Sequence, residues 1–314
     1  MNYTSKDLLT CHKKIKPYIH RTPVLTSQAL NEMSGAEIFF KCENFQRMGA
    51  FKMRGAAHVI LNLSDEQKAN GVVTHSSGNF AQAVSLAAKE LGIKAYIVMP
   101  SNAPQVKKDA VRSYGGIITE CEPTIEIRQA TTDKISAETG ATKLHPSNQV
   151  DVILGQGTAA MELLEDYPDL NIVMVPIGGG GLVAGTALAT HLFGKNCKTI
   201  GGEPFEVDDA YRSLLSGKIE NNKTANTVAD GLRTILGNHN FPIIQQHVDR
   251  IIRVEENEII AAMRLIWERM KIIIEPSCAV PFAGLLREKE KFAGKKIGII
   301  ISGGNVDLGN LPFS

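Results

Sequence analysis

Residues 172–181 read IVMVPIGGGG, an apolar run that leads directly into four consecutive glycines. The run is apolar at every position, which is typical of a strand buried on both faces of a parallel sheet. A helical pattern follows at 182–193. We therefore expect a strand, a glycine loop and a helix in succession, which is the unit from which α/β folds are built.

The glycine loop is suited to binding a phosphate group. Four glycines expose several backbone N–H groups, and the N-terminus of the next helix adds roughly half a positive charge. A tight turn with left-handed backbone would require fewer glycines. Residues 179–184 also fit the dinucleotide pattern G-x-G-x-x-A, with an acidic residue about twenty positions later, so an NAD-dependent oxidoreductase is an alternative of a different class.

Short β-rich runs alternate with longer helical patterns on both sides of this loop. The expected strands are 37–42, 71–74, 94–99, 116–119, 172–177, 198–202, 250–254 and 296–301. The expected helices include 79–91, 103–114, 124–139, 155–165, 182–193, 255–270 and 279–289. This alternation predicts an α/β fold with two open, mainly parallel twisted sheets and flanking helices.

The position of these units suggests how the chain divides. Four of them lie between residues 70 and 148 and are expected to form a small domain with its own sheet. Residues 1–69 and 149–314 are expected to form a larger, discontinuous domain. We expect the active site in the cleft between the two sheets, where ligands usually bind.

Composition excludes several classes of protein. The 314 residues carry 34 Lys and Arg against 33 Asp and Glu, so no strong field recruits nucleic acid or an acidic membrane surface. The five cysteines are scattered, which is typical of reduced thiols in the cytosol. The first residues are polar and amphipathic, so we expect no signal peptide, and no run approaches the ~18 apolar residues of a membrane span. We expect a soluble cytoplasmic protein that binds neither nucleic acid nor membrane.

A lysine near the start of a helix is a candidate nucleophile. Lys52 lies between Phe51 and Met53, with small residues nearby. An amine in an apolar pocket is disfavoured in its charged form, which makes a neutral nucleophile accessible near pH 7. The alternative is a solvated lysine that begins a helix, as most exposed lysines are.

Four motifs together reveal a resemblance. They are Phe51-Lys52-x-Arg54-Gly55-Ala56, Ser76-Ser77-Gly78-Asn79, the four glycines, and Ser302-Gly303-Gly304-Asn305. In this order they resemble the fold-type II pyridoxal-phosphate (PLP) enzymes, which have a tryptophan synthase β-like fold. Within that group the chain is most similar to the serine racemase and serine/threonine dehydratase branch, from residue 21 to the C-terminal SGGNVDL.

The resemblance implies roles for the residues of these motifs. Lys52 would hold PLP covalently and act as base at Cα, and Phe51 would pack on the pyridine ring. Asn79 would bind the ring hydroxyl, and Ser302 would meet the ring nitrogen. The phosphate would be bound by Gly178, Gly179, Gly180, Gly181 and Leu182.

Substrate binding is assigned to the second motif. The backbone donors of Ser76, Ser77 and Asn79 begin a helix and suit the carboxylate of an amino acid. Ser77 is also placed opposite Lys52, where a second proton-transfer group would permit racemisation. The alternative for Ser77 is a hydroxyl that caps the helix.

A divalent cation, Mg²⁺, Mn²⁺ or Ca²⁺, is also implied. The resemblance assigns Glu203, Asp209 and the main-chain carbonyl of Val207 as ligands, and such oxygens suit a hard cation. The alternative is an acidic cap before the helix that begins near Asp208.

The expected reaction is dehydration of small β-hydroxy amino acids. L-serine or L-threonine would give pyruvate or 2-oxobutyrate plus ammonia, with serine racemase activity at the same site. A primary serine racemase and a 3-hydroxyaspartate dehydratase are alternatives.

Two residues differ from the pattern of the family. Phe80 stands where the family usually has a histidine, and Met48 replaces a small polar residue near the family's nucleotide site. ATP remains an alternative as an effector, because the nucleotide site of the family is compatible with Arg47, Gln82, Tyr114 and Lys271. We also expect a homodimer.

Overall fold

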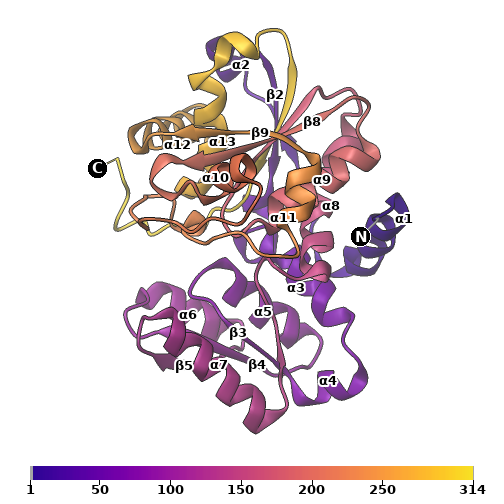
Figure 1. The fold of residues 1–314 in the computed structure, drawn as a ribbon, viewed down its shortest axis with the longest axis vertical. Helices are drawn as coiled ribbons and strands as arrows, with labels where there is room; N and C mark the ends of the chain where they lie inside the picture. Colours follow the sequence, from indigo (N-terminus) through magenta and orange to yellow (C-terminus); the bar gives the residue numbers. More distant parts are fainter. Residues whose placement is uncertain (1–2, 314) are drawn as a thin grey trace.

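Two sheets organise the computed structural model, which describes residues 3–313 (Figure 1). The larger has six strands in the order β1-β2-β10-β7-β8-β9, all parallel except for the β1–β2 pair. Its strands are β1 (Val24–Leu25), β2 (Glu37–Cys42), β7 (Ile172–Pro176), β8 (Lys198–Pro204), β9 (Val248–Val254) and β10 (Lys296–Ile301).

The second sheet is parallel throughout, in the order β5-β4-β3-β6. Its strands are β3 (Val72–His75), β4 (Ala95–Pro100), β5 (Ile117–Cys121) and β6 (Thr142–Lys143). The predicted α/β class with two mainly parallel sheets is therefore confirmed.

Helices connect and cover these strands. Those in and beside the smaller sheet are α3 (Lys52–Leu61), α4 (Asp65–Asn70), α5 (Asn79–Glu90), α6 (Gln105–Ser113) and α7 (Ile125–Thr139). The others are α1 (Ser5–Ile15), α2 (Gln28–Ser34), α8 (Val150–Asp166), α9 (Gly181–Phe193), α10 (Asp209–Ser216), α11 (Phe241–His247), α12 (Glu256–Met270) and α13 (Pro276–Arg287).

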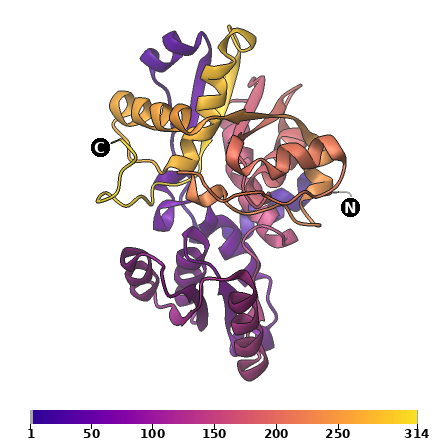
Figure 2. The same ribbon diagram turned by 60° about the vertical axis from the view of Figure 1, so that its left-hand side comes forward.

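The two sheets occupy different parts of the molecule. In Figures 1 and 2 the part with β3, β4 and β5 lies at one end of the long axis, and the larger sheet lies at the other. The domain limits at residues 70 and 148 stay a prediction. The outer ends of the larger predicted domain, residues 1, 2 and 314, lie outside the described residues.

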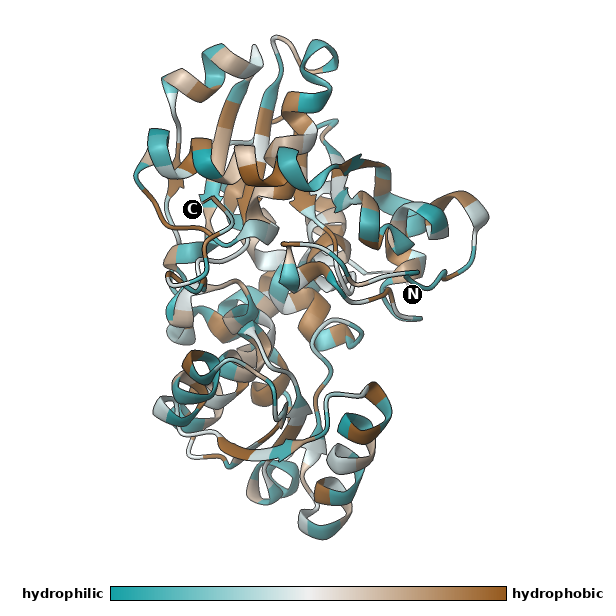
Figure 3. Ribbon diagram, turned by 90° about the vertical axis from the view of Figure 1, so that its left-hand side faces the viewer, coloured by the Kyte–Doolittle hydropathy of each residue, from teal (hydrophilic) through white to brown (hydrophobic). Residues whose placement is uncertain are grey.

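The core explains why β7 is apolar at every position. Val173 and Val175 belong to one buried cluster, while Ile172 and Met174 belong to another. Side chains alternate along a strand, so these two sets fill the two faces of the sheet. Figure 3 shows hydrophobic segments concentrated where strands and helices pack together.

The observed elements differ from the predicted ones mainly at their ends. α8 begins at Val150 rather than at residue 155, and β8 continues to Pro204 rather than ending at 202. Among residues 3–313, no helix combines the length and apolar character needed to cross a membrane.

Candidate active site

Two segments far apart in the sequence meet at the carboxyl end of β10. The backbone N–H of Phe51 donates a hydrogen bond of 3.0 Å to the carbonyl of Ser302. Next to this contact, Ala50 and Gly303 form an antiparallel bridge. The backbone therefore fixes Lys52, the first residue of α3, beside the end of β10.

The Lys52 amine lies in a largely apolar environment. Its Nζ atom is 4.9 Å from the centre of the Phe51 ring and 5.7 Å from that of Phe80. Nζ donates a hydrogen bond of 2.7 Å to the carbonyl of Pro146. Burial lowers the pKa of Lys52 to about 7, against an opposing effect of Glu275. A large neutral fraction near pH 7 makes the amine a competent nucleophile and proton acceptor.

A buried carboxyl group that the sequence analysis missed faces the same site. Glu275 precedes α13 and is 5% exposed. Its two oxygens accept hydrogen bonds of 3.1 and 3.0 Å from Nδ2 of Asn79. Burial raises the pKa of Glu275 to about 7, with a further contribution from Asp230. The only sequence signal was a glutamate between an apolar run and a proline at the start of a helix.

Asn79, the first residue of α5, makes hydrogen bonds through both the nitrogen and the oxygen of its side-chain amide. Its Oδ1 accepts a hydrogen bond of 2.8 Å from Nδ2 of Asn305, which also donates to the carbonyl of Met48 over 2.9 Å. Asn305 and Glu275 follow β10 and α12, whereas α5 packs on the smaller sheet. These bonds therefore tie the two parts of the molecule together at the site.

Ser302 lies beside a neutral thiol. Its side chain is 2% exposed, and its Oγ is 3.2 Å from Sγ of Cys278. The thiol also contacts the N–H and the carbonyl of Gly303. Burial raises the pKa of Cys278, so the thiol stays protonated.

The glycine loop joins β7 to α9 and presents unpaired donors. Gly180 has φ +82°, in the left-handed region that favours glycine. The N–H groups of Gly178, Gly179 and Gly180 donate no hydrogen bond to any residue in the described part of the chain. Gly181 and Leu182 open α9, where N–H groups lack intrahelical partners. This row of donors fits a phosphate.

Ser76 and Ser77 lie between β3 and α5. Oγ of Ser76 accepts a hydrogen bond of 3.4 Å from the N–H of Gly78. Gly78 itself is the N-cap of α5 and no side chain caps that helix, so the capping alternative for Ser77 is wrong. The Ser77 hydroxyl has no hydrogen-bond partner within residues 3–313 and is available to a ligand.

Glu203, near the end of β8, and Asp209, the first residue of α10, are both fully buried. The Glu203 carboxylate accepts hydrogen bonds from the N–H groups of Ala210 and Tyr211, as a helix cap does. Oδ2 of Asp209 accepts one from the N–H of Leu236, whereas Oδ1 makes no hydrogen bond of normal geometry among the described residues, although the Asn222 side chain is near enough to lower the pKa of Asp209. Burial raises the pKa of Asp209 to about 6, and burial together with Asp209 raises that of Glu203 well above its usual range.

The predicted metal ligands are two carboxylates and one carbonyl. In the described chain, no group of three or more His, Cys, Asp or Glu is arranged to hold a metal ion. Val207, whose carbonyl would be the third ligand, is buried in the short turn Phe205–Val207 that leads into α10. The free oxygen of Asp209, beside a second buried carboxyl group, fits a hard cation.

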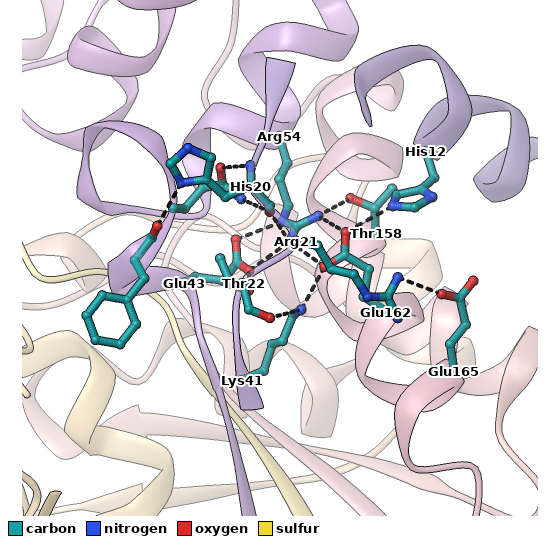
Figure 4. A network of polar contacts seen from close by, with 12 residues as sticks. His12, His20, Arg21, Thr22, Lys41, Glu43, Arg54, Thr158, Glu162 and Glu165 are labelled. Carbon is teal, nitrogen blue, oxygen red and sulfur yellow. Dashed lines mark hydrogen bonds and ion pairs between the residues drawn. The ribbon is translucent and has the colours of Figure 1, made fainter. Parts of the chain in front are cut away.

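A network of buried charges lies on the other side of α3 (Figure 4). Arg54 is two residues after Lys52 and therefore points away from it around the helix. It donates to Glu43 over 2.7 Å and to Glu162 over 2.8 Å. Lys41 also donates to Glu162, over 2.6 Å. All four side chains are fully buried, so this network anchors α3 to β2 and α8.

The residues compatible with a nucleotide effector are dispersed. Arg47 pairs with Glu90. Gln82 lines a cavity of about 660 Å³ together with Lys107, Asp230 and Asn305. Tyr114 and Lys271 do not line this cavity.

Proteins of known activity resemble the chain over nearly its whole length. It is 50% identical over 311 residues to the beta-hydroxyaspartate dehydratase of Paracoccus denitrificans, covering 99% of each chain. It is 48% identical to the serine racemase of Dictyostelium discoideum, covering 98% of this chain and 96% of that one. Maize serine racemase superposes with a TM-score of 0.96 at 44% identity, covering 98% and 95% of the two chains. Residues 15–303 match the family described as pyridoxal-phosphate dependent enzyme. The chain therefore belongs to the pyridoxal-phosphate dependent enzymes.

Proposed function

We propose that the chain is a dehydratase of small β-hydroxy amino acids, converting L-serine or L-threonine to pyruvate or 2-oxobutyrate plus ammonia. The observation that carries this proposal is the Lys52 amine, whose pKa burial lowers to about 7, so that about half of it is neutral near pH 7. When bound, PLP withdraws electrons from Cα and makes its hydrogen acidic. Membership in the family replaces the dinucleotide interpretation of residues 179–184.

The side chains have separate tasks in this reaction. Lys52 binds PLP covalently and, once free, takes the Cα proton on Nζ, where the Pro146 carbonyl accepts a hydrogen bond from it. The resulting ammonium can protonate the departing β-hydroxyl, which leaves as water. The first turn of α5, with Ser76, Ser77 and Asn79, binds the substrate carboxylate.

The remaining residues hold the cofactor. Phe51 would pack on the ring, and Ser302 would meet the ring nitrogen. Nδ2 of Asn79 carries two hydrogens, so it can donate to the ring hydroxyl while still bonded to Glu275. The row of donors at Gly178, Gly179, Gly180, Gly181 and Leu182 binds the phosphate.

Two further activities are supported by specific observations. The unpaired hydroxyl of Ser77 favours serine racemase activity, because a second proton-transfer group is what inversion at Cα needs. The similarity to the Paracoccus dehydratase favours 3-hydroxyaspartate as a substrate. It differs from serine by one additional carboxylate.

A substrate panel tests the proposal. The purified protein is given L-serine, D-serine, L-threonine and 3-hydroxyaspartate, and the 2-oxo acid and the enantiomer are measured in the same tube. Borohydride reduction followed by peptide mass spectrometry should place PLP on Lys52. Release of no 2-oxo acid from any of these substrates, or labelling of another lysine, would overturn it.

A Ser77→Ala variant separates the two proton-transfer roles. We expect racemisation of L-serine to fall by ~10²-fold or more, and elimination from L-serine to fall much less. An equal loss of both activities would assign Ser77 to substrate binding alone.

We also propose that Glu203, Asp209 and the carbonyl of Val207 hold a divalent cation, because Oδ1 of Asp209 is buried and makes no hydrogen bond of normal geometry among the described residues. Mg²⁺ should then raise the Tm of the wild type, since it binds the folded chain. Asp209→Asn should abolish this response. In metal-free buffer at pH 8 the same variant should be more stable than the wild type, because it removes a buried carboxyl whose pKa is raised to about 6. No Tm response of the wild type to Mg²⁺, Mn²⁺ or Ca²⁺ would contradict the site.

From the resemblance we also propose a homodimer and an effect of ATP, and from the scattered cysteines a cytoplasmic location. Light scattering tests the first. A change in the rate of 2-oxo acid release on adding ATP tests the second.

A further inference from the structure

Residues 146–147 lie between the Lys52 amine and the glycine loop. The carbonyl of Pro146 accepts the hydrogen bond from Lys52. The next residue, Ser147, packs under the loop, where its Oγ would lie 2.5 Å from a Cβ placed on Gly179. This short segment therefore contacts both the reactive amine and the phosphate-binding loop.

A buried glutamine on α8 reaches the same carbonyl. Gln156 is fully buried, and its Nε2 donates a hydrogen bond of 3.2 Å to the carbonyl of Pro146. Its other amide atom, Oε1, faces the loop and would lie 2.6 Å from a Cβ placed on Gly181. Oε1 has no hydrogen-bond partner in the part of the chain that the structure describes. A half-satisfied buried amide lowers stability, so an apolar side chain of equal length would serve packing better.

The surrounding structure keeps residues 146–147 in place independently of Gln156. Asn240 is fully buried, and its Nδ2 donates to the carbonyls of Ser147 and Gly179 over 3.2 and 2.8 Å. α8 itself packs against both α3 and α9, the helices that begin at Lys52 and at Gly181. Loss of the Gln156 amide should therefore remove one contact without displacing the segment.

We propose that Gln156 is a positioning residue that fixes the Pro146 carbonyl between the Lys52 amine and the glycine loop. The inference rests on the proposed PLP-dependent function, in which Lys52 alternates between a covalent bond and a free amine. The free amine needs an acceptor already in place, and the Pro146 carbonyl is that acceptor. Nε2 of Gln156 and Nζ of Lys52 both donate to the oxygen of Pro146, so the positive end of the Gln156 amide dipole lies near the Lys52 amine. This dipole disfavours the ammonium form and lowers the pKa of Lys52.

Two titratable side chains face Lys52 in the described chain. Glu275 has a pKa of about 7 and favours the ammonium form. His145 accepts hydrogen bonds on Nδ1 from the N–H groups of Ser147 and Asn148. Burial and the Lys52 charge lower the pKa of His145 to about 4, so it is neutral from pH 5.5 to 9. Neither side chain changes in a variant of Gln156.

The test compares the full-length wild type with Gln156→Met and Gln156→Glu, after removal of bound PLP. The rate of PLP uptake is followed by absorbance from pH 5.5 to 9, and its midpoint reports the ionisation of Lys52. The affinity for PLP and the Tm of the cofactor-free protein are measured in parallel. Thr190→Val is the matched control, because Thr190 is buried on α9 and its hydroxyl lacks a partner among residues 3–313.

We expect Gln156→Met to raise the pH midpoint by about half to one unit, the equivalent of one hydrogen bond, and to weaken PLP binding about three- to tenfold. Gln156→Glu should weaken PLP binding more than Gln156→Met, because it places a carboxylate beside the phosphate. Thr190→Val should match the wild type in midpoint and affinity.

Two results would overturn the inference. One is a Gln156→Met protein with a lower Tm but the wild-type midpoint, which would show a purely structural role. The other is a Gln156→Glu protein that binds PLP as tightly as the wild type. If the wild type itself forms no covalent adduct at Lys52, the proposed function fails instead, so the two failures are distinguishable.

Discussion

Lys41 and Lys52 both direct their ammonium groups into the fold, Lys52 less completely, and the surroundings of the two groups differ. Lys41 is fully buried, and its Nζ donates to the Glu162 carboxylate over 2.6 Å and to the carbonyl of Thr22 over 2.8 Å. Nζ of Lys52 instead donates to an uncharged carbonyl and lies near two aromatic rings. The two lysines are attached to neighbouring elements, β2 and α3.

The comparison extends to their neighbours. Burial would raise the pKa of Glu162, but a hydrogen bond from His12 and the bonds and charges of Arg54 and Lys41 lower it below its usual range. At Lys52 and Glu275 burial dominates, and both pKa values move to about 7. Paired charges therefore stay ionised and anchor α3, while less completely paired groups on its other side can exchange protons near neutral pH.

The largest effect is expected from Lys52→Met, which should abolish covalent PLP binding and reduce 2-oxo acid release by ~10³-fold or more. The folded-state pKa of Lys52 is lower than that of the unfolded chain, so its charged form lowers the free energy of unfolding. This destabilisation is absent above pH 10.5 and complete below about pH 7. The cofactor-free variant should therefore be more stable at pH 7, by about 2–4 kcal/mol in urea unfolding.

Lys41→Met is the matched control for this prediction. It leaves the buried Glu162 carboxylate short of a partner and should lower stability, while borohydride labelling at Lys52 persists. A Lys52→Met protein that is less stable than the wild type would break the contrast between the two lysines.

Glu162→Gln should destabilise the fold by about 3–5 kcal/mol, because it leaves Arg54 and Lys41 with too little negative charge in a buried setting. The folded-state pKa of Glu162 is lowered, so its contribution is present above its unfolded pKa of 4.5 and is lost as the pH falls below that value. Urea unfolding between pH 3 and 7 should therefore show a weaker acid dependence in the variant.

The neighbouring Glu165 supplies the control for Glu162. It pairs with Arg21 at the surface, so Glu165→Gln should cost less than about 1 kcal/mol. Equal costs for the two variants would show that the buried network does not anchor the helix.

A smaller effect is expected from Glu275→Gln. It removes a negative charge that favours the ammonium form of Lys52, so the acid limb of the pH–rate profile should move to lower pH, by about half a unit. The folded-state pKa of Glu275 is raised, so its contribution to stability is present below pH 4.5 and is lost as the pH rises through about 7.

Stability measurements check the same Glu275 variant. It should be more stable than the wild type at pH 8 and similar to it at pH 4. An acid limb that moves to higher pH would contradict the interaction between Glu275 and Lys52.

Local pattern was enough to predict much of the fold and to select Lys52 and the glycine loop as candidates for the site. β7 could be recognised because both of its faces are buried, and the four glycines mark the start of α9. β1 and β6 have two residues each, which is too short for any periodicity to appear. The start of α8 was placed too late, because its first residues are fixed by packing between α3 and α9 rather than by a strong pattern.

The site residues that the sequence did not reveal reach the site only through contacts between distant parts of the chain. Glu275 and Asn305 are 196 and 226 positions from Asn79, and Gln156 meets Pro146 across a turn and a helix. A buried glutamine in an α-helix has no distinctive sequence pattern. Its importance becomes visible only when its partner is known.

Phe80, which departs from the histidine usual in the family, has a consequence for the fate of isotopes. Two hydrocarbon rings and an uncharged carbonyl contact the Lys52 amine, and none of these three groups can exchange protons with water. Exchange of an abstracted deuteron with solvent therefore depends on water that reaches the half-buried amine and on Glu275, the carboxyl group that acts on it. A histidine at position 80 would add a further exchange route, so Phe80 favours internal return of the deuteron over its loss to solvent.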